Sequence, residues 1–285
     1  VSGVTSLYAS NQNISDLTGI EDFIALTSLF CQSNQLASLD ISQNTALTAL
    51  ICHNNQLTSL DVSNNTALTS VTCYTNQISN LDLTQNINLT FLRCESNQLT
   101  SLDLTNNTSL NYFYFYNNQL SALDLSNNNG LIRLSAATNQ LTSLTVSNMP
   151  NLNELFCQNN QLSNLDVRTG NNTSMSIFKA HNNPNLTCIS VDDATWATTN
   201  WTTANGNIDA HTSFSDDCPD ITPPALLSVS FSTSQVDVSN GAQTVTLTKT
   251  LTDDISGVAY SGNGCSGYVS GAVLTSPSGQ QTSKI

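Results

Sequence analysis

The stretch LTSLFCQSNQLASLDISQNTAL, residues 26–47, decides the fold, because the chain repeats it with a period of 21 residues. One column of the repeat is an unbroken series of asparagines: Asn34, Asn55, Asn76, Asn97, Asn118, Asn139 and Asn160. Each unit carries its apolar pattern twice, first up to Asn34 and again up to Asn44. A fixed period of this length indicates a solenoid, in which every unit stacks on its neighbours.

The repeat follows the pattern L-x-x-L-x-L-x-x-N-x-L of leucine-rich repeats, with Cys31 at the third Leu position. Its two sub-repeats, of 10 and 11 residues, resemble the nested-period bacterial class called IRREKO, over about residues 26–167. Strand-like alternation turns Leu29 and Cys31 inward and Phe30 outward. Neither half has the length or the apolar spacing of a helix. We therefore predict a mainly β solenoid with short parallel strands on both faces.

Four segments are expected along the chain. Residues 1–25 form an irregular N-terminal capping repeat, in which LTGIEDFIALTSL resembles internalin-type repeats, and residues 26–186 form the solenoid. Residues 187–221 form a C-terminal cap. Residues 222–285 form a further β domain. Trp196 and Trp201 are expected to cover the last coil, because the open end of a solenoid would otherwise expose its core.

The last segment has a different periodicity. After Pro223-Pro224 the chain alternates with period two, and Asn240-Gly241 predicts a tight hairpin. This segment resembles the immunoglobulin-like modules of secreted bacterial proteins. Such a β-sandwich needs about 100 residues, whereas 64 remain from residue 222. We therefore expect an incomplete immunoglobulin-like domain within a longer multidomain protein.

The composition excludes several classes of partner. The net charge is -14 and the chain has six Lys and Arg in total, too few to neutralise a nucleic acid backbone or to dock on anionic lipid. No apolar run is long enough to insert into a membrane. An acidic chain rich in Asn, Thr and Ser resembles a bacterial protein that is extracellular, either secreted or attached to the cell surface.

The cysteines fall into three groups. Five cysteines share one column of the repeat, in which Phe115 and Ala136 take the same place in two other repeats. A column that accepts Cys, Phe and Ala is apolar and buried, so these five are predicted to be buried free thiols: Cys31, Cys52, Cys73, Cys94 and Cys157. Cys188 and Cys218 flank the end of the repeats and are predicted to form a disulfide, worth about 3–4 kcal/mol in the chain-entropy model. Cys265 is left over, with a partner beyond Ile285 or a buried environment as the alternatives.

Two further columns are polar. The first Asn column is expected to bond backbone groups, and a second, looser ladder is expected at Asn44, Asn65, Asn86, Asn107 and Asn128. An outward carboxylate column contains Asp40, Asp61, Asp82, Asp103, Asp124 and Asp166, and is interrupted by Thr145. Stacked like charges are destabilising. Hydrogen bonds from the adjacent Ser/Thr column could offset this repulsion. The alternative is calcium bound between coils by the first five carboxylates, Asp40, Asp61, Asp82, Asp103 and Asp124. No other cofactor is expected.

The outward positions of the first strand vary between repeats and gather aromatic and charged side chains. The predicted ligand-binding face consists of His53, Tyr74, Phe91, Arg93, Glu95, Tyr112, Tyr114, Tyr116 and Arg133. Tyr and Arg are enriched in binding hot spots, because a rigid body with a polar tip gains contact area at low entropic cost. The alternative is that aromatic residues merely suit an exposed strand surface.

Motifs for catalysis are weak. Residues 262–267 match G-x-G-x-x-G, but Tyr268-Val269 follows where a dinucleotide site needs a helix. His53, His181 and His211 have no recognisable nucleophile partner. We therefore expect no enzyme, and predict a non-catalytic module for recognition or adhesion that binds a protein or a glycan.

Two alternatives remain open at the level of sequence. A structural spacer or ice-surface binder would use flat repetitive faces, such as the column of Thr27, Thr48, Thr69 and Thr90, which breaks at Asn111. An accessory region of a longer secreted hydrolase would leave catalysis to residues outside this chain.

Overall fold

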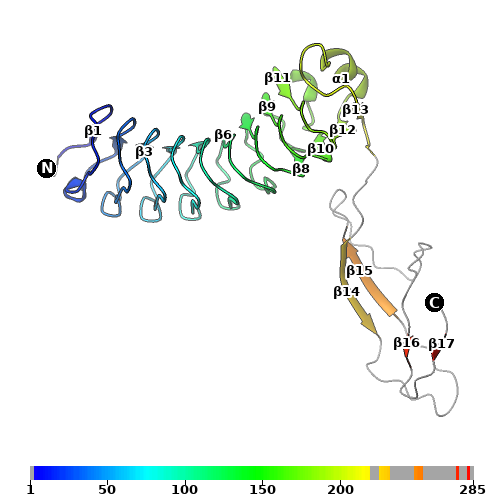
Figure 1. Cartoon of the computed structure of the whole chain (residues 1–285), viewed down its shortest axis with the longest axis horizontal. Coiled ribbons are helices and arrows are strands. Elements are labelled where there is room, and N and C mark those ends of the chain that lie inside the picture. Colours follow the sequence, from blue (N-terminus) through cyan, green and yellow to red (C-terminus); the bar gives the residue numbers. More distant parts are fainter. Residues whose placement is uncertain (1–2, 219–224, 232–246, 253–273, 276–280, 283–285) are drawn as a thin grey trace. The chain divides into compact units, whose positions relative to one another are not determined.

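The computed structural model describes residues 3–218, 225–231, 247–252, 274–275 and 281–282. It contains two compact units, Val1–Cys218 and Pro219–Ile285. In the first unit the coils stack side by side in single file from the N-terminal end to the region of α1 (Figure 1).

One side of the first unit is a nine-stranded parallel sheet, here called the front sheet, in the order β1-β2-β3-β4-β5-β6-β7-β9-β11. Its strands are β1 (Ser6–Tyr8), β2 (Ser28–Phe30), β3 (Ala49–Ile51), β4 (Ser70–Thr72), β5 (Phe91–Arg93), β6 (Tyr112–Tyr114), β7 (Arg133–Ser135), β9 (Glu154–Phe156) and β11 (Ile177–Lys179). From β2 to β9 each residue pairs with its counterpart 21 residues away, as Leu29 does with Leu50, whereas the spacing is 22 residues between β1 and β2 and 23 between β9 and β11. The columns of the sequence are therefore columns in space.

Among the described residues of the first unit, the opposite side has strands only in its C-terminal part. A four-stranded parallel sheet, in the order β13-β12-β10-β8, contains β8 (Ser143–Thr145), β10 (Asn164–Val167), β12 (Cys188–Val191) and β13 (Ser213–Ser215). The prediction of strands on both faces is wrong for the coils before residue 143, where the stretch from Leu39 to Ile41 and its equivalents have irregular backbone.

A local hydrogen bond accounts for much of this difference. In the early coils the Asp column accepts the backbone N–H two residues on, as Asp61 does from Ser63 at 2.9 Å, which offers the backbone an alternative to a strand ladder. The second sheet begins at β8, where Thr145 replaces the Asp. Asp166, within β10, still accepts the backbone N–H of Arg168, just after the strand, so pairing with β8 and β12 sustains the sheet once it has started.

The core is one continuous apolar cluster enclosed by the coils. Leu29 and Cys31 are fully buried, as the alternation predicts. Phe113 and Phe115, which replace smaller residues of their columns, are also fully buried, and their ring centroids lie 4.6 Å apart.

Both asparagine ladders bond the backbone. Asn118 donates to the carbonyls of Cys94 and Phe115 and accepts from the N–H of Leu99. The second ladder is the more deeply buried but makes fewer hydrogen bonds; Asn107, for example, donates to the carbonyls of Leu83 and Asn86. The buried side-chain oxygens of this second ladder have no hydrogen-bond partner among the described residues.

The C-terminal end of the first unit is closed by aromatic side chains around α1 (Ala194–Asn200), whose first turn is capped by Asp193. Trp201 is buried and stacks on Phe178 with ring centroids 4.1 Å apart, and Trp196 meets Trp201 edge-on. The Cys188–Cys218 disulfide is present. Two short 3-10 turns, Ile20–Asp22 and Asn172–Ser174, complete the unit.

In the second unit, β14 (Ala225–Phe231) pairs antiparallel with β15 (Leu247–Thr252), and β16 (Leu274–Thr275) with β17 (Gln281–Thr282). Most of the predicted immunoglobulin-like domain lies outside the described residues. The same is true of the Pro223-Pro224 linker, the Asn240-Gly241 turn, the glycine-rich motif at 262–267 and Cys265.

Candidate functional site

The outward side chains of the front sheet form parallel rows across its strands. Phe91, Tyr112 and Arg133 are direct neighbours in one row, on β5, β6 and β7. Arg93 and Tyr114 are neighbours in the next row. The structure therefore brings together the variable positions that the sequence singled out.

Six of these side chains form an unbroken series of ring and guanidinium contacts, one from each of six successive coils. We call it the diagonal stack: His53, Tyr74, Arg93, Tyr114, Arg133 and Phe156. The centroids of the His53 and Tyr74 rings lie 4.1 Å apart. The Arg93 guanidinium carbon lies 4.4 Å from the Tyr74 centroid and 5.3 Å from the Tyr114 centroid. The corresponding distances of Arg133 are 5.1 Å to Tyr114 and 5.2 Å to Phe156. Each guanidinium therefore lies between two rings.

Arg93 also holds a buried carboxylate. Its Nε donates to Glu95 Oε1 at 2.8 Å, and its Nη2 is paired with the same oxygen. The Glu95 side chain is 1% exposed, so the prediction that Glu95 presents itself outward is wrong. Burial works against charge on Arg93, but the hydrogen bond and negative charge of Glu95 outweigh it and raise the pKa of the guanidinium. Glu95 Oε2 has no partner among the described residues.

Arg133 is held less tightly. Its Nη1 lies 2.9 Å from Glu154 Oε2, with the two side chains 35% and 25% exposed. Glu154 and Phe156 were missed from sequence, although both occupy the predicted rows exactly one period after Arg133 and Ser135. Extending the rows by one coil would have found them.

The remaining members of the site are the half-buried Phe91 and the exposed Tyr112 and Tyr116. The Phe91 ring lies 6.1 Å from Tyr112 and 5.9 Å from Tyr114, centroid to centroid. Tyr112 and Tyr116 are 38% and 37% exposed. We define the aromatic face as the diagonal stack together with Phe91, Tyr112 and Tyr116. A separate stacked pair, Tyr8 and Phe30, lies on β1 and β2.

His53 is a neutral member of the aromatic face. Burial lowers the pKa of its imidazole, and the nearby charge of Arg93 lowers it further. Because the ordinary value is 6.5, the ring is uncharged at pH 7, and its contact with Tyr74 is one between neutral rings.

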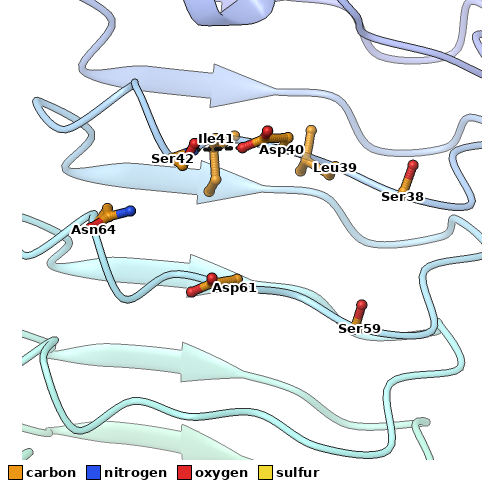
Figure 2. A pocket seen from close by; sticks show the side chains of 8 residues that line it. All are labelled: Ser38, Leu39, Asp40, Ile41, Ser42, Ser59, Asp61 and Asn64. Carbon is orange, nitrogen blue, oxygen red and sulfur yellow. Dashed lines mark hydrogen bonds between the residues drawn. The ribbon is translucent and has the colours of Figure 1, made fainter.

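On the opposite side, two members of the Asp column, Asp40 and Asp61, line a groove of about 420 Å³ (Figure 2). Asp40 and Asp61 accept hydrogen bonds from Ser42 and Ser63, respectively, at 3.0 and 2.9 Å from the backbone N–H. These bonds lower the pKa of both carboxyl groups. Within the part of the chain that the structure describes, no three His, Cys, Asp or Glu side chains converge as a metal site would require. Calcium at Asp40, Asp61, Asp82, Asp103 or Asp124 stays a prediction.

The cysteine column has no reactive member. Cys31, Cys52, Cys73, Cys94 and Cys157 are buried free thiols. Burial raises the pKa of Cys31 and Cys73 to about 12, so these side chains are uncharged near neutral pH and serve as small apolar groups.

Comparisons with known proteins bear on the fold. No family model matches the chain. Internalin J of Listeria monocytogenes (serotype 4b, strain F2365) is 50% identical over 42 residues, which are 15% of this chain and 5% of that protein. The functional domain of InlJ from Listeria monocytogenes, described as including a cysteine ladder, is 30% identical over 69% of this chain and 57% of its own, with a TM-score of 0.42.

Internalin C2 of Listeria monocytogenes strain 4b F2365 is the better structural match, with a TM-score of 0.56 and 24% identity over 66% of this chain and 81% of its own. The chain therefore has an internalin-like leucine-rich repeat solenoid fold. It spans one twentieth of the length of the curated relative. In the described residues, no helix is long and apolar enough to cross a membrane.

Proposed function

We propose that this chain is a non-catalytic recognition module of an extracellular bacterial protein, and that it binds a protein partner through the aromatic face. The observation that carries the proposal is the diagonal stack, in which both arginines are fixed between rings before any partner arrives. Side chains ordered in advance lose little entropy on binding, and Tyr and Arg are the residue types that dominate binding hot spots.

The arrangement of the rings favours a protein over a glycan. A sugar packs on an open ring face, but Tyr74 is covered by His53 and Arg93. Tyr114 is likewise covered by Arg93 and Arg133. The stack therefore presents ring edges and guanidinium edges, which suit polar and aromatic side chains of a partner. The internalin-like fold supports the same class of function, since it offers a long sheet face of rigid, variable positions.

We further propose that the solenoid belongs to the nested 21-residue repeat class, and that it forms part of a longer secreted or surface-attached protein with an immunoglobulin-like domain. The repeat period and the two antiparallel pairs of the second unit support these two points. An ice-surface role is less favoured, because the hydroxyl groups of the exposed Thr column already donate hydrogen bonds within the protein. Thr48, Thr69 and Thr90 each donate to a backbone carbonyl of the preceding coil.

The test requires variants that remove contact area without damaging the fold. Arg93 is unsuitable alone, because its loss would strand the buried carboxylate of Glu95. Tyr112 and Tyr116 are exposed, so the double variant Tyr112→Ala/Tyr116→Ala should fold normally. Tyr8→Ala is the control, since it removes a tyrosine of the same sheet that lies outside the aromatic face and is even more exposed, at 75% against 38% for Tyr112 and 37% for Tyr116.

The wild-type chain and both variants are applied to an array of secreted and cell-surface proteins and to a glycan array. A protein ligand that is kept by Tyr8→Ala and lost by at least about tenfold in affinity in the double variant is the expected result. A ligand found only on the glycan array, or one that the double variant binds as well as the wild type, would show that the partner class or the site is wrong.

A further inference from the structure

We infer that the protein partner of the aromatic face presents acidic side chains to the outward edges of Arg93 and Arg133. This inference rests on the proposed function and adds the chemistry of the partner. It starts from the hydrogen-bond donors of the two arginines.

Both guanidinium groups have donors that the protein leaves unused. Arg93 bonds Glu95 through Nε and Nη2 only, and among the described residues its Nη1 has no partner, while its side chain is one third exposed. Arg133 Nη1 lies 2.9 Å from Glu154 Oε2, and Arg133 Nε is buried without a partner in the described part of the chain, so the donors of Arg133 that can face a partner are those of its Nη groups; the side chain is 35% exposed. A planar group with free donors at an exposed edge is a ready partner for a carboxylate.

The rings decide how such a carboxylate can approach. Tyr74 and Tyr114 cover the two faces of the Arg93 guanidinium, and Tyr114 and Phe156 cover those of Arg133. With two rings against each guanidinium, and with Nε of Arg93 bonded to Glu95 and Nε of Arg133 buried, a carboxylate would approach each arginine in the plane of its terminal Nη groups. The arginines lie on β5 and β7, two strands apart, or roughly 10 Å at the usual strand spacing. One carboxylate cannot serve both, so the partner needs two acidic residues.

The distribution of charge supports an acidic partner at this place. Of the four basic side chains between residues 3 and 218, Arg93, Arg133 and Lys179 belong to the front sheet. Asp40 and Asp61 of the Asp column lie on the opposite side of the coils, Glu95 is buried, and Glu154 of the front sheet, 25% exposed, is paired with Arg133. Although the chain carries a net charge of -14, screening over about 8 Å at physiological salt leaves the front sheet largely independent of the far side.

The experiment uses the full chain and an array of synthetic peptides drawn from random sequences, at physiological salt. Every peptide is matched by a copy in which Asp and Glu are replaced by Asn and Gln. The variants are Arg133→Gln, Arg133→Lys, and Arg93→Gln combined with Glu95→Gln, so that no buried charge is stranded. The control is Arg168→Gln, made together with Asp166→Asn so that this buried carboxylate is not stranded; Arg168 has the same 35% exposure as Arg133 but lies outside the front sheet.

We expect the wild type to select peptides with at least two acidic residues, and to bind their amide copies about tenfold or more weakly. Arg133→Gln and the Arg93/Glu95 variant should lose this preference, and the Arg168/Asp166 control should keep it. Arg133→Lys, which keeps the charge without the fork, should lose most of it. If Arg133→Gln does not fold, as judged by circular dichroism, Arg133→Lys decides the result.

Several outcomes would overturn the inference. They are binding that ignores the amide replacement, an equal loss in the Arg168/Asp166 control, or no peptide bound at all. A protein ligand that depends on Tyr112 and Tyr116 but not on the arginines would leave the proposed function in place and remove only the acidic partner.

Discussion

At the scale of single residues, Glu95 and the five column cysteines are all buried, but they differ in whether burial requires a charged partner. Glu95 is an ionisable group kept beneath the front sheet by a dedicated arginine. The five thiols need no partner, because a protonated sulfur is a weakly polar group that packs as a small hydrophobe. This difference leads to a prediction about alkaline pH.

Stability should fall above pH 9 because the thiols must stay protonated in the fold. Burial raises the pKa of Cys73 from 9.0 to about 12. Protonation therefore favours the folded state, so the contribution is complete below pH 9 and is lost as the pH rises from 9 towards 12. Urea denaturation from pH 8 to pH 10.5, under argon, should show a smaller decline for Cys73→Ala than for the wild type.

Comparing the slope of unfolding free energy against pH in the wild type with that in Cys73→Ala removes the effects of other groups that titrate in the same range. Alanine is tolerated in this column, as Ala136 shows, so a collapse of the variant is not expected. Equal pH slopes in the two proteins would mean that the thiol does not contribute to the decline.

At the scale of elements, the end of the solenoid depends on one side chain. Trp201 follows α1, is buried, and contacts the rings of Phe178, Trp196 and Phe214. Trp201→Ala should lower the free energy of unfolding by about 3–5 kcal/mol, since it leaves a cavity over the last coil. Trp196→Ala, which removes the edge-on neighbour at a partly exposed position, should cost clearly less. Chemical denaturation measures both, and similar losses would contradict the central role of Trp201.

The same scale shows what a sequence can and cannot predict for such a fold. The period placed the front strands from β2 to β9, their inward columns and the neighbours within each row, because parallel coils in register convert spacing directly into position. The backbone on the opposite side of the coils was harder to predict, because each Asp there accepts a local hydrogen bond from a backbone N–H, which competes with strand pairing. Glu95 also escaped prediction. The strand alternation predicts that Glu95 faces outward, but its ion pair with Arg93 holds the side chain below the surface. A repeat period carries no information about which side chains form ion pairs.

At the scale of the whole molecule, the dominant feature is the excess of negative charge. The chain has 20 Asp and Glu against six Lys and Arg, and the Asp column stacks several carboxylates along one side. Self-repulsion of this kind destabilises the compact state and is screened by salt. The melting temperature should therefore rise by several degrees between about 0.01 M and 0.3 M NaCl.

A choice of cation makes this prediction specific. Choline chloride should raise the melting temperature as much as NaCl, because simple screening does not depend on the identity of the ion. A clearly larger rise with CaCl2 at equal ionic strength, lost in Asp61→Asn/Asp82→Asn, would instead indicate calcium bound along the Asp column.

The diagonal stack takes one side chain from each of six successive coils, and this has an evolutionary consequence. Unequal crossing-over within the repeats can delete or duplicate a whole coil in one genetic step. The coils on either side would then stack directly on each other, because neighbouring coils are equivalent. Loss of the coil that carries Tyr114 would place Arg93 beside Arg133 and turn an attraction into a repulsion. Partner choice in such a protein can thus change abruptly while its architecture is inherited intact.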